Sequence, residues 1–296
     1  MVEARLRRSL LFVPAAEPRK IERAREAGAD TLLLDLEDSV APQQKAEARV
    51  HVAAALRAGG SGAEVAVRVN APGTPYFEDD LTAVVGAGGG VVLLPKAETV
   101  AGVAAVVAML ERLETGGAVA AHAATKLLLL VESPLGVAEA LALARATPRV
   151  EALCFGHADF SLAMGLTQAD ASRGVVYHAR CTLVIAAHAA GVAAIDSVHL
   201  AVKDDAGFRA DAKLGLELGF EGKLCIHPRQ VEIANAVHTP RAEQIDYALR
   251  VIEAWQRAQA EGRGVFTLND KMIDAPLVAV QQRVLARARR AGVLQD

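Results

Sequence analysis

Two acidic residues follow hydrophobic segments of this sequence and are the first candidates for chemistry. Glu132 follows the run LLLLV at 127–131, and Asp159 comes soon after the segment ALCF at 152–155. An unpaired charge inside a protein core is costly, so such a carboxylate must be paired, bound to a metal ion or outside the core. Carboxylates that lie close together share a proton or a cation. Without a histidine and cysteine cluster beside it, this pair favours a hard ion, Mg²⁺ rather than Zn²⁺.

Arg68, in the segment VRVN at 67–70, is a third candidate, and the residues alone leave two interpretations open. One is structural: the guanidinium forms a bidentate ion pair with Asp35 or Glu37. The other is functional: its planar fork clamps the carboxylate of a substrate, a task that arginine suits better than lysine.

Other polar residues recur at the ends of hydrophobic segments along the chain. We expect these side chains to converge on one mouth, and the alternative for any single one is a salt bridge at the rim. Lys96 has a further interpretation as a Schiff-base lysine, but the many nearby carboxylates favour a charged, salt-bridged side chain. The other members of the set are Asp35, Glu37, Asp38, Asn70, Asp196 and His227.

Short hydrophobic segments alternate with longer alanine-rich segments of helical periodicity over most of the chain. Continuous apolar strands that alternate with helices are typical of parallel strands covered on both faces. Such units predict an α/β fold, a (β/α)8 TIM barrel, whose usual length is about 250 residues and whose chemistry lies at the carboxyl ends of its strands. A doubly wound open sheet is the alternative, but no Gly-rich dinucleotide motif follows the first strand. The predicted strands lie within residues 9–14, 30–38, 64–70, 90–96, 126–133, 151–159, 191–198 and 222–228.

The sequence changes character after Pro240. A long amphipathic helix is followed there by an irregular, glycine-containing segment and a final helix. We therefore expect residues 1–240 to form the barrel and residues 241–296 to form a C-terminal helical extension. Because this extension is surplus to a barrel, we expect it to act as a lid or to exchange between subunits.

The composition excludes several classes of function. The 296 residues are 52% hydrophobic and 4% aromatic, and 32 Lys and Arg residues oppose 35 Asp and Glu residues, for a net charge of −3. No basic or aromatic patch predicts nucleic-acid binding, and no apolar run has the length of a membrane span or the features of a signal peptide. The three cysteines (Cys154, Cys181 and Cys225) show no metal-ligand spacing and are expected to be inert thiols. These features predict a cytoplasmic protein.

Several motifs, in their order along the chain, resemble the HpcH/HpaI aldolase family, which includes the citrate lyase β-chain and the malyl-CoA and citramalyl-CoA lyases. The resemblance extends over roughly residues 7–280, and the set is specific although each motif alone is weak. The motifs are RSLLFVPAAEPRK, LLLDLEDSVAPQQKAEAR, VRVN, LLPKAE, LLVESPLG, CFGHADFSLAMG, CIHP and KMIDAPLV.

The resemblance assigns roles to individual residues. It implies a Mg²⁺ site on Glu132 and Asp159, with Glu132 also facing the substrate. It implies that Arg68 grips the carboxylate of a 2-oxo acid. Arg19 and Lys20, in the segment after the first strand, resemble the family's contacts to the phosphates of coenzyme A.

Two aspartates also receive catalytic roles from the resemblance. Asp38, together with its neighbours Asp35 and Glu37, resembles the partners that orient Arg68 or the water ligands of the metal. Asp274, in KMIDAP, is similar to an acid/base aspartate that relatives insert from a neighbouring subunit. The resemblance therefore implies a homo-oligomer, a trimer or a hexamer.

The implied activity is that of a Mg²⁺-dependent carbon–carbon lyase. A 3-hydroxyacyl thioester of the malyl-, citramalyl- or citryl-CoA type would be cleaved to acetyl-CoA, or an analogue, and a 2-oxo acid. The thioester is carried either by coenzyme A or by an acyl-carrier partner. Two alternatives remain open: a metal-dependent aldolase that acts on free hydroxy-oxo acids, and a citrate lyase β subunit that is active only within a complex.

Overall fold

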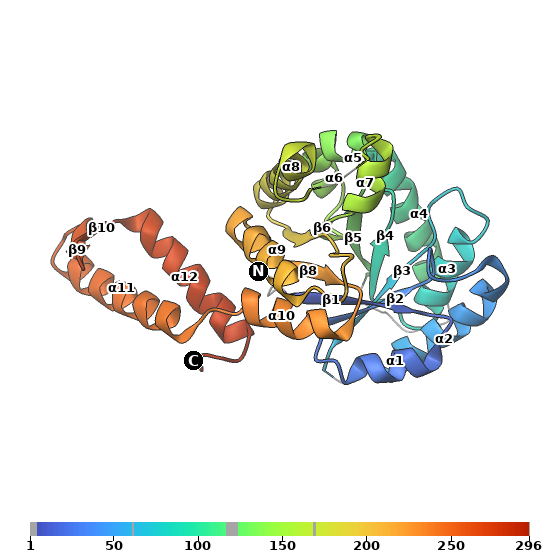
Figure 1. The fold of residues 1–296 in the computed structure, drawn as a ribbon, viewed down its shortest axis with the longest axis horizontal. Helices are drawn as coiled ribbons and strands as arrows, with labels where there is room; N and C mark the ends of the chain where they lie inside the picture. The colour runs from blue at the N-terminus through green and yellow to red at the C-terminus, as the bar shows by residue number, and fades with distance from the viewer. Residues whose placement is uncertain (1–4, 61, 117–123, 168–169, 296) are drawn as a thin grey trace. The chain divides into compact units, whose positions relative to one another are not determined.

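The computed structural model describes residues 5–60, 62–116, 124–167 and 170–295, and a closed barrel of eight parallel strands dominates it (Figure 1). Each strand pairs with the next along the chain, and β1 closes the barrel by pairing with β8. The predicted TIM barrel is therefore confirmed. The strands are β1 (Ser9–Pro14), β2 (Thr31–Asp35), β3 (Glu64–Arg68), β4 (Val91–Leu94), β5 (Lys126–Val131), β6 (Val150–Phe155), β7 (Ala193–Asp196) and β8 (Gly222–Cys225).

Helices surround the barrel (Figure 1), and the longer ones bury apolar side chains on one face. In α2 the buried residues Ala48, Val52 and Ala55 are spaced four and three apart, so they share one face. Within the described residues, no helix has both the length and the hydrophobicity to cross a bilayer. The helices are α1 (Pro18–Arg25), η1 (Pro42–Gln44), α2 (Lys45–Ala58), α3 (Phe77–Gly86), α4 (Val100–Gly116), α5 (Pro134–Ala138), α6 (Ala140–Ala144), α7 (His157–Ala163), α8 (Gly174–Ala190), α9 (Asp205–Leu218) and α10 (Pro228–His238).

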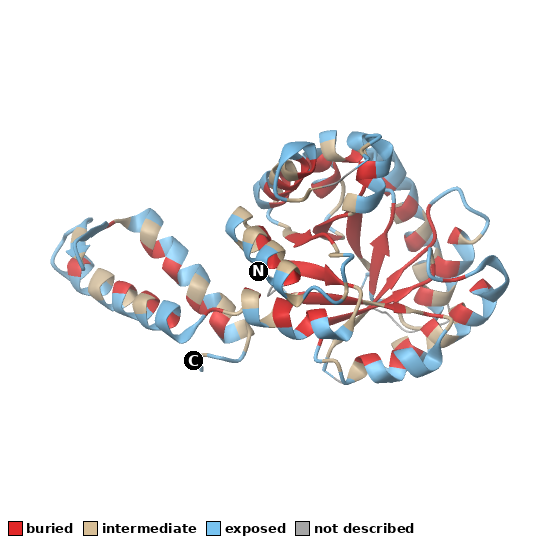
Figure 2. Cartoon of the chain, viewed as in Figure 1, coloured by how far each residue is buried: buried red, intermediate tan, exposed pale blue. Residues whose placement is uncertain are grey.

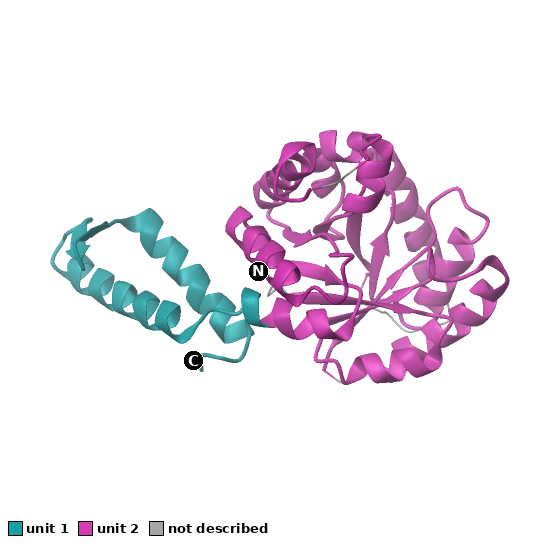
Figure 3. Ribbon diagram, viewed as in Figure 1, with its two compact units in different colours: residues 1–6, 236–296 teal, residues 7–235 magenta. Residues whose placement is uncertain are grey.

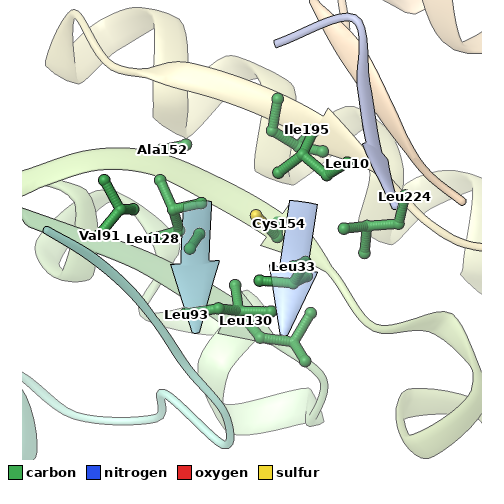
Figure 4. Packing of buried hydrophobic residues seen from close by; sticks show 11 residues of the cluster. Leu10, Leu33, Val91, Leu93, Leu128, Leu130, Ala152, Cys154, Ile195 and Leu224 are labelled. Carbon is green, nitrogen blue, oxygen red and sulfur yellow. The ribbon is translucent and has the colours of Figure 1, made fainter. Parts of the chain in front are cut away.

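Alternate residues of each barrel strand fill the interior, and Figure 2 shows these strands buried over most of their length. In β5, Leu128 and Leu130 belong to the interior cluster, whereas the equally buried Leu127 and Leu129 point the other way, toward the helices. This two-residue period also decides where the first residues past each strand point. The interior cluster, drawn in Figure 4, consists of Leu10, Leu33, Ala66, Val91, Leu93, Leu128, Leu130, Ala152, Cys154, Ile195 and Leu224.

Residues 236–296, with the N-terminal residues 1–6, form a second compact unit apart from residues 7–235 (Figure 3). Two antiparallel partners, α11 and α12, pack through a small apolar cluster that includes Ala248 and Leu285. The elements of this unit are α11 (Ala242–Ala260), β9 (Phe266–Leu268), β10 (Lys271–Ile273) and α12 (Ala275–Arg290).

The segment between these two helices, which the sequence pattern leaves irregular, forms a hairpin. The strands β9 and β10 pair in antiparallel register. Asn269 and Asp270, at the turn, both have positive φ, of 49° and 59°. A two-residue hairpin turn requires this backbone conformation, and Asn and Asp adopt it more readily than most residues.

Candidate active site

The register of β2 and β3 places Asp35 directly opposite Arg68 at the carboxyl ends of the two strands. Arg68 Nε and Nη2 donate to the two carboxylate oxygens of Asp35 at 2.7 and 2.8 Å, which makes a buried bidentate ion pair. Burial alone would raise the pKa of Asp35, but the hydrogen bonds and the charge of Arg68 outweigh it and hold that pKa below its ordinary value. The structural interpretation of Arg68, an ion pair with Asp35, is therefore confirmed.

The remaining nitrogen of Arg68, Nη1, faces two further carboxylates. It lies 3.0 Å from Asp38 Oδ2 and 3.1 Å from Glu37 Oε2. The side chain of Asp38 is 71% exposed, so water screens this contact and a ligand carboxylate can replace it at low cost. Substrate binding at Nη1 is thus compatible with the ion pair to Asp35.

Glu37 experiences a different electrostatic balance from Asp35. Burial raises its pKa to about 7; the charge of Arg68 opposes this rise, and the charge of Asp38 adds to it. With a pKa near neutrality, Glu37 is protonated in a part of the molecules and ionised in the rest at pH 7.

Glu132 is the first residue past β5 and continues the inward-facing series of Leu128 and Leu130. It is 5% exposed, and its Oε1 accepts a hydrogen bond from the backbone N–H of Lys96 at 2.8 Å. Lys96 has a φ of 53°, in the left-handed region that residues with a Cβ rarely adopt. In this conformation its N–H points at the carboxylate, while its own side chain is exposed.

The opposite side of Glu132 depends on the absence of a side chain at Gly156. A Cβ at this position would lie 2.5 Å from Glu132 Cβ and 2.7 Å from Glu132 Oε2. The φ of Gly156 is −99°, which any residue can adopt, so glycine is needed here for space and not for backbone freedom. Lys96 and Gly156 together define where the carboxylate lies.

The electrostatics of Glu132 fit a cation. Burial raises its pKa to about 8; the Lys96 N–H opposes the rise and the charge of Asp159 adds to it. A carboxylate that burial and a negative neighbour destabilise is one that a bound cation stabilises. Asp159, in the exposed first turn of α7, lines the same cavity, and two carboxylates with room for water and substrate suit Mg²⁺. In the described part of the chain, no group of three or more His, Cys, Asp or Glu side chains forms a closed metal site.

The cavity at this mouth has a volume of about 390 Å³, the size of a small-molecule site. Five of the predicted residues line this cavity together. The apolar residues of the lining were not among those that the sequence singled out. An apolar lining residue carries the same sequence signal as any core residue, so no pattern distinguishes it. The predicted residues in the lining are Asp35, Asp38, Arg68, Glu132 and Asp159, and the main additions are Phe12, Pro14, Val198, Leu224 and Ile226.

A larger cavity, of about 1070 Å³, adjoins the first and shares His157 and Val198 with it. Its walls come mainly from the start of α8, the segment after β7 and the start of α9. None of the predicted site residues lines it.

Asp196 does not join the site, which corrects the expectation that every polar strand end converges on the mouth. It follows the inward-facing Ile195, so its side chain points to the helices instead. There it is fully buried and lies 2.6 Å from Arg180 and 3.0 Å from Lys223. Asp211 of α9, 2.7 Å from Lys223, completes a cluster of two positive and two negative charges.

His227 and Asn70 also serve the scaffold. His227 Nδ1 accepts a hydrogen bond from the backbone N–H of Arg229 at 3.2 Å, in the turn that starts α10. Asn70 is 4% exposed, and its side-chain amide donates to Asp80 at 2.6 Å.

Three further predicted residues, which the resemblance singled out, are not among those that line this cavity. Arg19 and Lys20 are exposed at the start of α1, where Lys20 Nζ lies 2.6 Å from Glu17 Oε1. Asp274 belongs to the second compact unit and caps α12 by accepting from the Leu277 N–H at 3.1 Å. The contacts to a thioester that the resemblance implies for them stay predictions.

Comparison with known sequences gives matches over nearly the whole chain. A model of the HpcH/HpaI aldolase/citrate lyase family matches residues 8–228. The chain is 36% identical over 295 residues to the citrate lyase subunit beta of Escherichia coli K12, which covers 99% of this chain and 97% of that protein. It is 32% identical over 283 residues to a (3S)-malyl-CoA thioesterase of Cereibacter sphaeroides, with coverage of 95% and 94%.

Solved structures give the same result. CitE from Mycobacterium tuberculosis, in complex with magnesium, acetoacetate and coenzyme A, matches with a TM-score of 0.76 and 31% identity over 96% of this chain and 97% of that one. A citrate lyase from Burkholderia xenovorans matches with a TM-score of 0.85 and 27% identity over 100% and 95%. The citrate lyase beta subunit from M. tuberculosis with oxaloacetate and magnesium matches with a TM-score of 0.67 and 31% identity over 81% and 98%.

We predict that Gly156→Ala weakens Mg²⁺ binding at least tenfold, because the added Cβ forces Glu132 away from the Lys96 N–H. The unfolding free energy should fall by about 1–3 kcal/mol, as for other overpacked sites. Titration calorimetry with MgCl₂ and urea unfolding measure the two effects. The matched control is Gly86→Ala in α3, whose Cβ meets nothing within 4 Å; it should leave Mg²⁺ affinity unchanged and should not lower the unfolding free energy. If Gly156→Ala bound Mg²⁺ as tightly as the wild type, the position of Glu132 would not depend on the missing side chain at residue 156.

We predict that Glu37→Gln removes part of the pH dependence of stability in protein kept metal-free with EDTA. The folded pKa of Glu37 is raised from 4.5 to about 7, so the folded state keeps a proton that the unfolded state loses in this range. The contribution of Glu37 to the unfolding free energy of the wild type is therefore fully present below pH 4.5, and it is lost as the pH rises to 7.

Urea unfolding at intervals between pH 4.5 and 8 checks this prediction. The slope of the unfolding free energy against pH should be more negative for wild type than for Glu37→Gln. The difference is at most about 1.4 kcal/mol per pH unit, the value for one proton. Identical slopes would mean that Glu37 titrates with the same pKa in the folded and unfolded states.

Proposed function

The chain belongs to the HpcH/HpaI aldolase/citrate lyase family, and from this premise we propose that it is a Mg²⁺-dependent carbon–carbon lyase that cleaves a 3-hydroxyacyl thioester. The products are a 2-oxo acid and acetyl-CoA or an analogous thioester. The observation that carries the proposal is the buried carboxyl of Glu132, whose pKa is raised by burial and by Asp159, in a cavity that Arg68 also lines.

Glu132 and Asp159 are the residues that hold the cation. The Lys96 N–H fixes one oxygen of Glu132, and the other lies over Gly156, so the carboxylate has a defined orientation before the cation binds. A Mg²⁺ ion held by these two carboxylates would supply positive charge to an oxygen-rich substrate and lower the pKa of its hydroxyl. The relatives from M. tuberculosis that were solved with magnesium support this assignment.

Arg68 binds the carboxylate of the oxo-acid half through Nη1. Its two bonds to Asp35 fix the plane of the guanidinium, so little side-chain entropy is lost when the substrate binds. Asp38 orients Nη1 until a ligand carboxylate takes its place. In this way the structural and functional interpretations of Arg68 describe one arrangement.

The chemical step requires two proton transfers. The substrate hydroxyl gives its proton to a general base, its oxygen forms the carbonyl of the 2-oxo acid, and the electron pair of the breaking carbon–carbon bond passes to the thioester half as an enolate. The enolate carbon then takes up a proton to become the acetyl thioester, and we assign Asp274 as the acid. Because Asp274 belongs to the second unit, we further propose a homo-oligomer, a trimer or a hexamer, in which this unit of one subunit serves the barrel of another.

The thioester half carries the remaining specificity. We assign the exposed side chains of Arg19 and Lys20 to the phosphates of coenzyme A, in line with the M. tuberculosis relative solved with coenzyme A. An acyl-carrier partner is the other carrier, since several relatives are named as the beta subunit of citrate lyase. The buried thiols of Cys154 and Cys225, whose pKa burial raises to about 12, suit the cytoplasm that we propose for the protein.

The experiment that tests the proposal measures acetyl-CoA release from malyl-CoA, citramalyl-CoA and citryl-CoA, each with Mg²⁺ and with excess EDTA. We predict cleavage of at least one substrate with Mg²⁺ and none with EDTA. Glu132→Ala and Asp159→Ala should each lose at least a hundredfold in rate with the fold intact by circular dichroism. Glu111→Ala, which removes a carboxylate that is 61% exposed on α4, is the control and should retain the wild-type rate.

The pattern of failure distinguishes the alternatives. Cleavage of free hydroxy-oxo acids, with indifference to coenzyme A, would indicate an aldolase without a thioester. Activity that appears only after addition of an acyl-carrier partner would indicate a subunit that works within a complex. A Glu132→Ala protein with full, Mg²⁺-dependent activity would remove Glu132 from the metal site.

We predict that Arg68→Lys weakens binding of the 2-oxo acid roughly ten- to a hundredfold, because a point charge replaces the planar fork and the bidentate bond to Asp35 is lost. Inhibition of cleavage by added 2-oxo acid measures this affinity. The control is Arg112→Lys, a surface arginine paired with Glu78, which should leave the inhibition constant unchanged. An unchanged constant for Arg68→Lys would restrict Arg68 to its ion pair.

A further inference from the structure

A lysine occupies a core position of α2. The buried residues Lys45, Ala48 and Val52 are spaced three and four apart, so they share one face of this helix. Lys45 is 6% exposed, although lysine side chains are almost never buried without a charged partner. Among the residues that the structure describes, no carboxylate lies within 4.0 Å of its Nζ. A buried ammonium group of this kind is costly, so packing alone does not account for a lysine here.

The ammonium group of Lys45 binds the loop that follows β2, residues 36–39. Its Nζ donates to the backbone carbonyls of Leu36 at 2.8 Å and Glu37 at 3.0 Å. The side-chain amide of Asn70 also donates to the Leu36 carbonyl, at 3.0 Å. The ring of Tyr76, whose centre lies 5.1 Å from Nζ, presents a face that attracts a cation. Lys45 therefore joins the start of α2 to this loop by charge-assisted hydrogen bonds.

The other side of the same loop faces the candidate active site. The N–H of Glu37 donates to Asp35 Oδ1 at 2.9 Å, and the N–H of Ser39 donates to Asp35 Oδ2 at 3.1 Å. The carbonyl of Leu36 and the N–H of Glu37 belong to one planar peptide unit and point in opposite directions. Lys45 on one side of this unit thus fixes the direction of the N–H that binds Asp35 on the other.

This chain of contacts ends at Arg68. Asp35 accepts from Nε and Nη2 of Arg68, which leaves Nη1 for a ligand. Asp38, on the loop itself, lies 3.0 Å from Nη1, and Ser39 lines the cavity beside it. A displaced loop would therefore move both the carboxylate that holds Arg68 and the wall next to its free nitrogen.

Lys45 also places a positive charge behind an acidic set of side chains. Burial lowers the pKa of Lys45, and four carboxylates oppose that change: Asp80, Asp35, Glu37 and Asp38. The attraction is mutual, so the ammonium group offsets part of the negative charge that an anionic substrate meets near Arg68.

Resting on the lyase function proposed above, we propose that Lys45 is a positioning residue for the oxo-acid half of the substrate. It acts through the loop and Asp35 on Arg68 and makes no contact with the substrate itself. Glu132 follows β5 and Asp159 lies on α7, so the residues assigned to the cation do not belong to this loop. Loss of Lys45 should therefore weaken binding of the acid and spare binding of the metal ion.

The test is titration calorimetry of full-length Lys45→Met, first with MgCl₂ and then, in saturating Mg²⁺, with pyruvate and with freshly dissolved oxaloacetate. Methionine keeps the apolar stem of lysine and removes its charge and its donors. For whichever acid the wild type binds more tightly, we expect affinity at least about tenfold weaker, with Mg²⁺ affinity within about threefold of wild type. Lys45→Gln, which is also neutral and retains a polar end, should give the same pattern if Lys45→Met does not fold.

Two further variants separate positioning from general damage. Val52→Ala removes buried methyl groups from the same face of α2, so it should lower the thermal midpoint yet leave both affinities within about threefold of wild type. Lys45→Arg keeps the charge and donors that can reach both carbonyls, so it should restore most of the affinity for the acid. Circular dichroism establishes that each variant is folded.

The outcomes separate this inference from the function on which it rests. Wild-type affinity for the acid in the neutral variants of Lys45 overturns the positioning role and leaves the lyase assignment standing. Equal losses for Mg²⁺ and the acid, or a Lys45→Arg protein as weak as Lys45→Met, overturn it as well. Binding of neither acid by wild-type protein that binds Mg²⁺ overturns both the positioning role and the proposed function.

Discussion

Parallel closure of the barrel is the constraint on which the rest of this structure depends. Because β1 pairs with β8 and all strands run in one direction, the carboxyl ends of the strands surround a single opening. A residue just past a strand end reaches that opening only if it continues the inward-facing alternation of the strand. Leu130 packs in the interior, and Glu132, two residues later, lines the cavity. Strand direction and pleat therefore place Asp35, Arg68 and Glu132, whereas Asp38 and Asp159 lie in the segments that follow β2 and β6.

The site is electrostatically unbalanced, and this imbalance links its folding to its ligands. Arg68 and Asp35 satisfy each other, but burial and Asp159 together raise the pKa of Glu132 to about 8. Folding thus holds one carboxyl in an environment that disfavours its charged form. A bound cation reverses that cost, so cation binding should also stabilise the folded barrel.

The charge cluster behind β7 and β8 shows what a purely structural set of charges looks like in the same barrel. Arg180 and Lys223 balance Asp196 and Asp211, and the first three are fully buried between strands and helices. Removing any one of these partners would leave an uncompensated buried charge. The candidate site differs because its carboxylates outnumber its cationic group.

The sequence by itself determined the barrel and the family. The alternation of apolar runs with helical segments and the order of the motifs can both be read along the chain without knowledge of its tertiary contacts. It also singled out Arg68, Glu132 and Asp159, which share one cavity. Only the tertiary structure decided which strand-end charges face the opening and which, like Asp196, face the helices. Strands buried on both faces read as continuous apolar runs, so the two-residue period that separates inside from outside is hidden in the sequence. For the same reason the sequence did not mark Ile226 as a residue that lines the cavity.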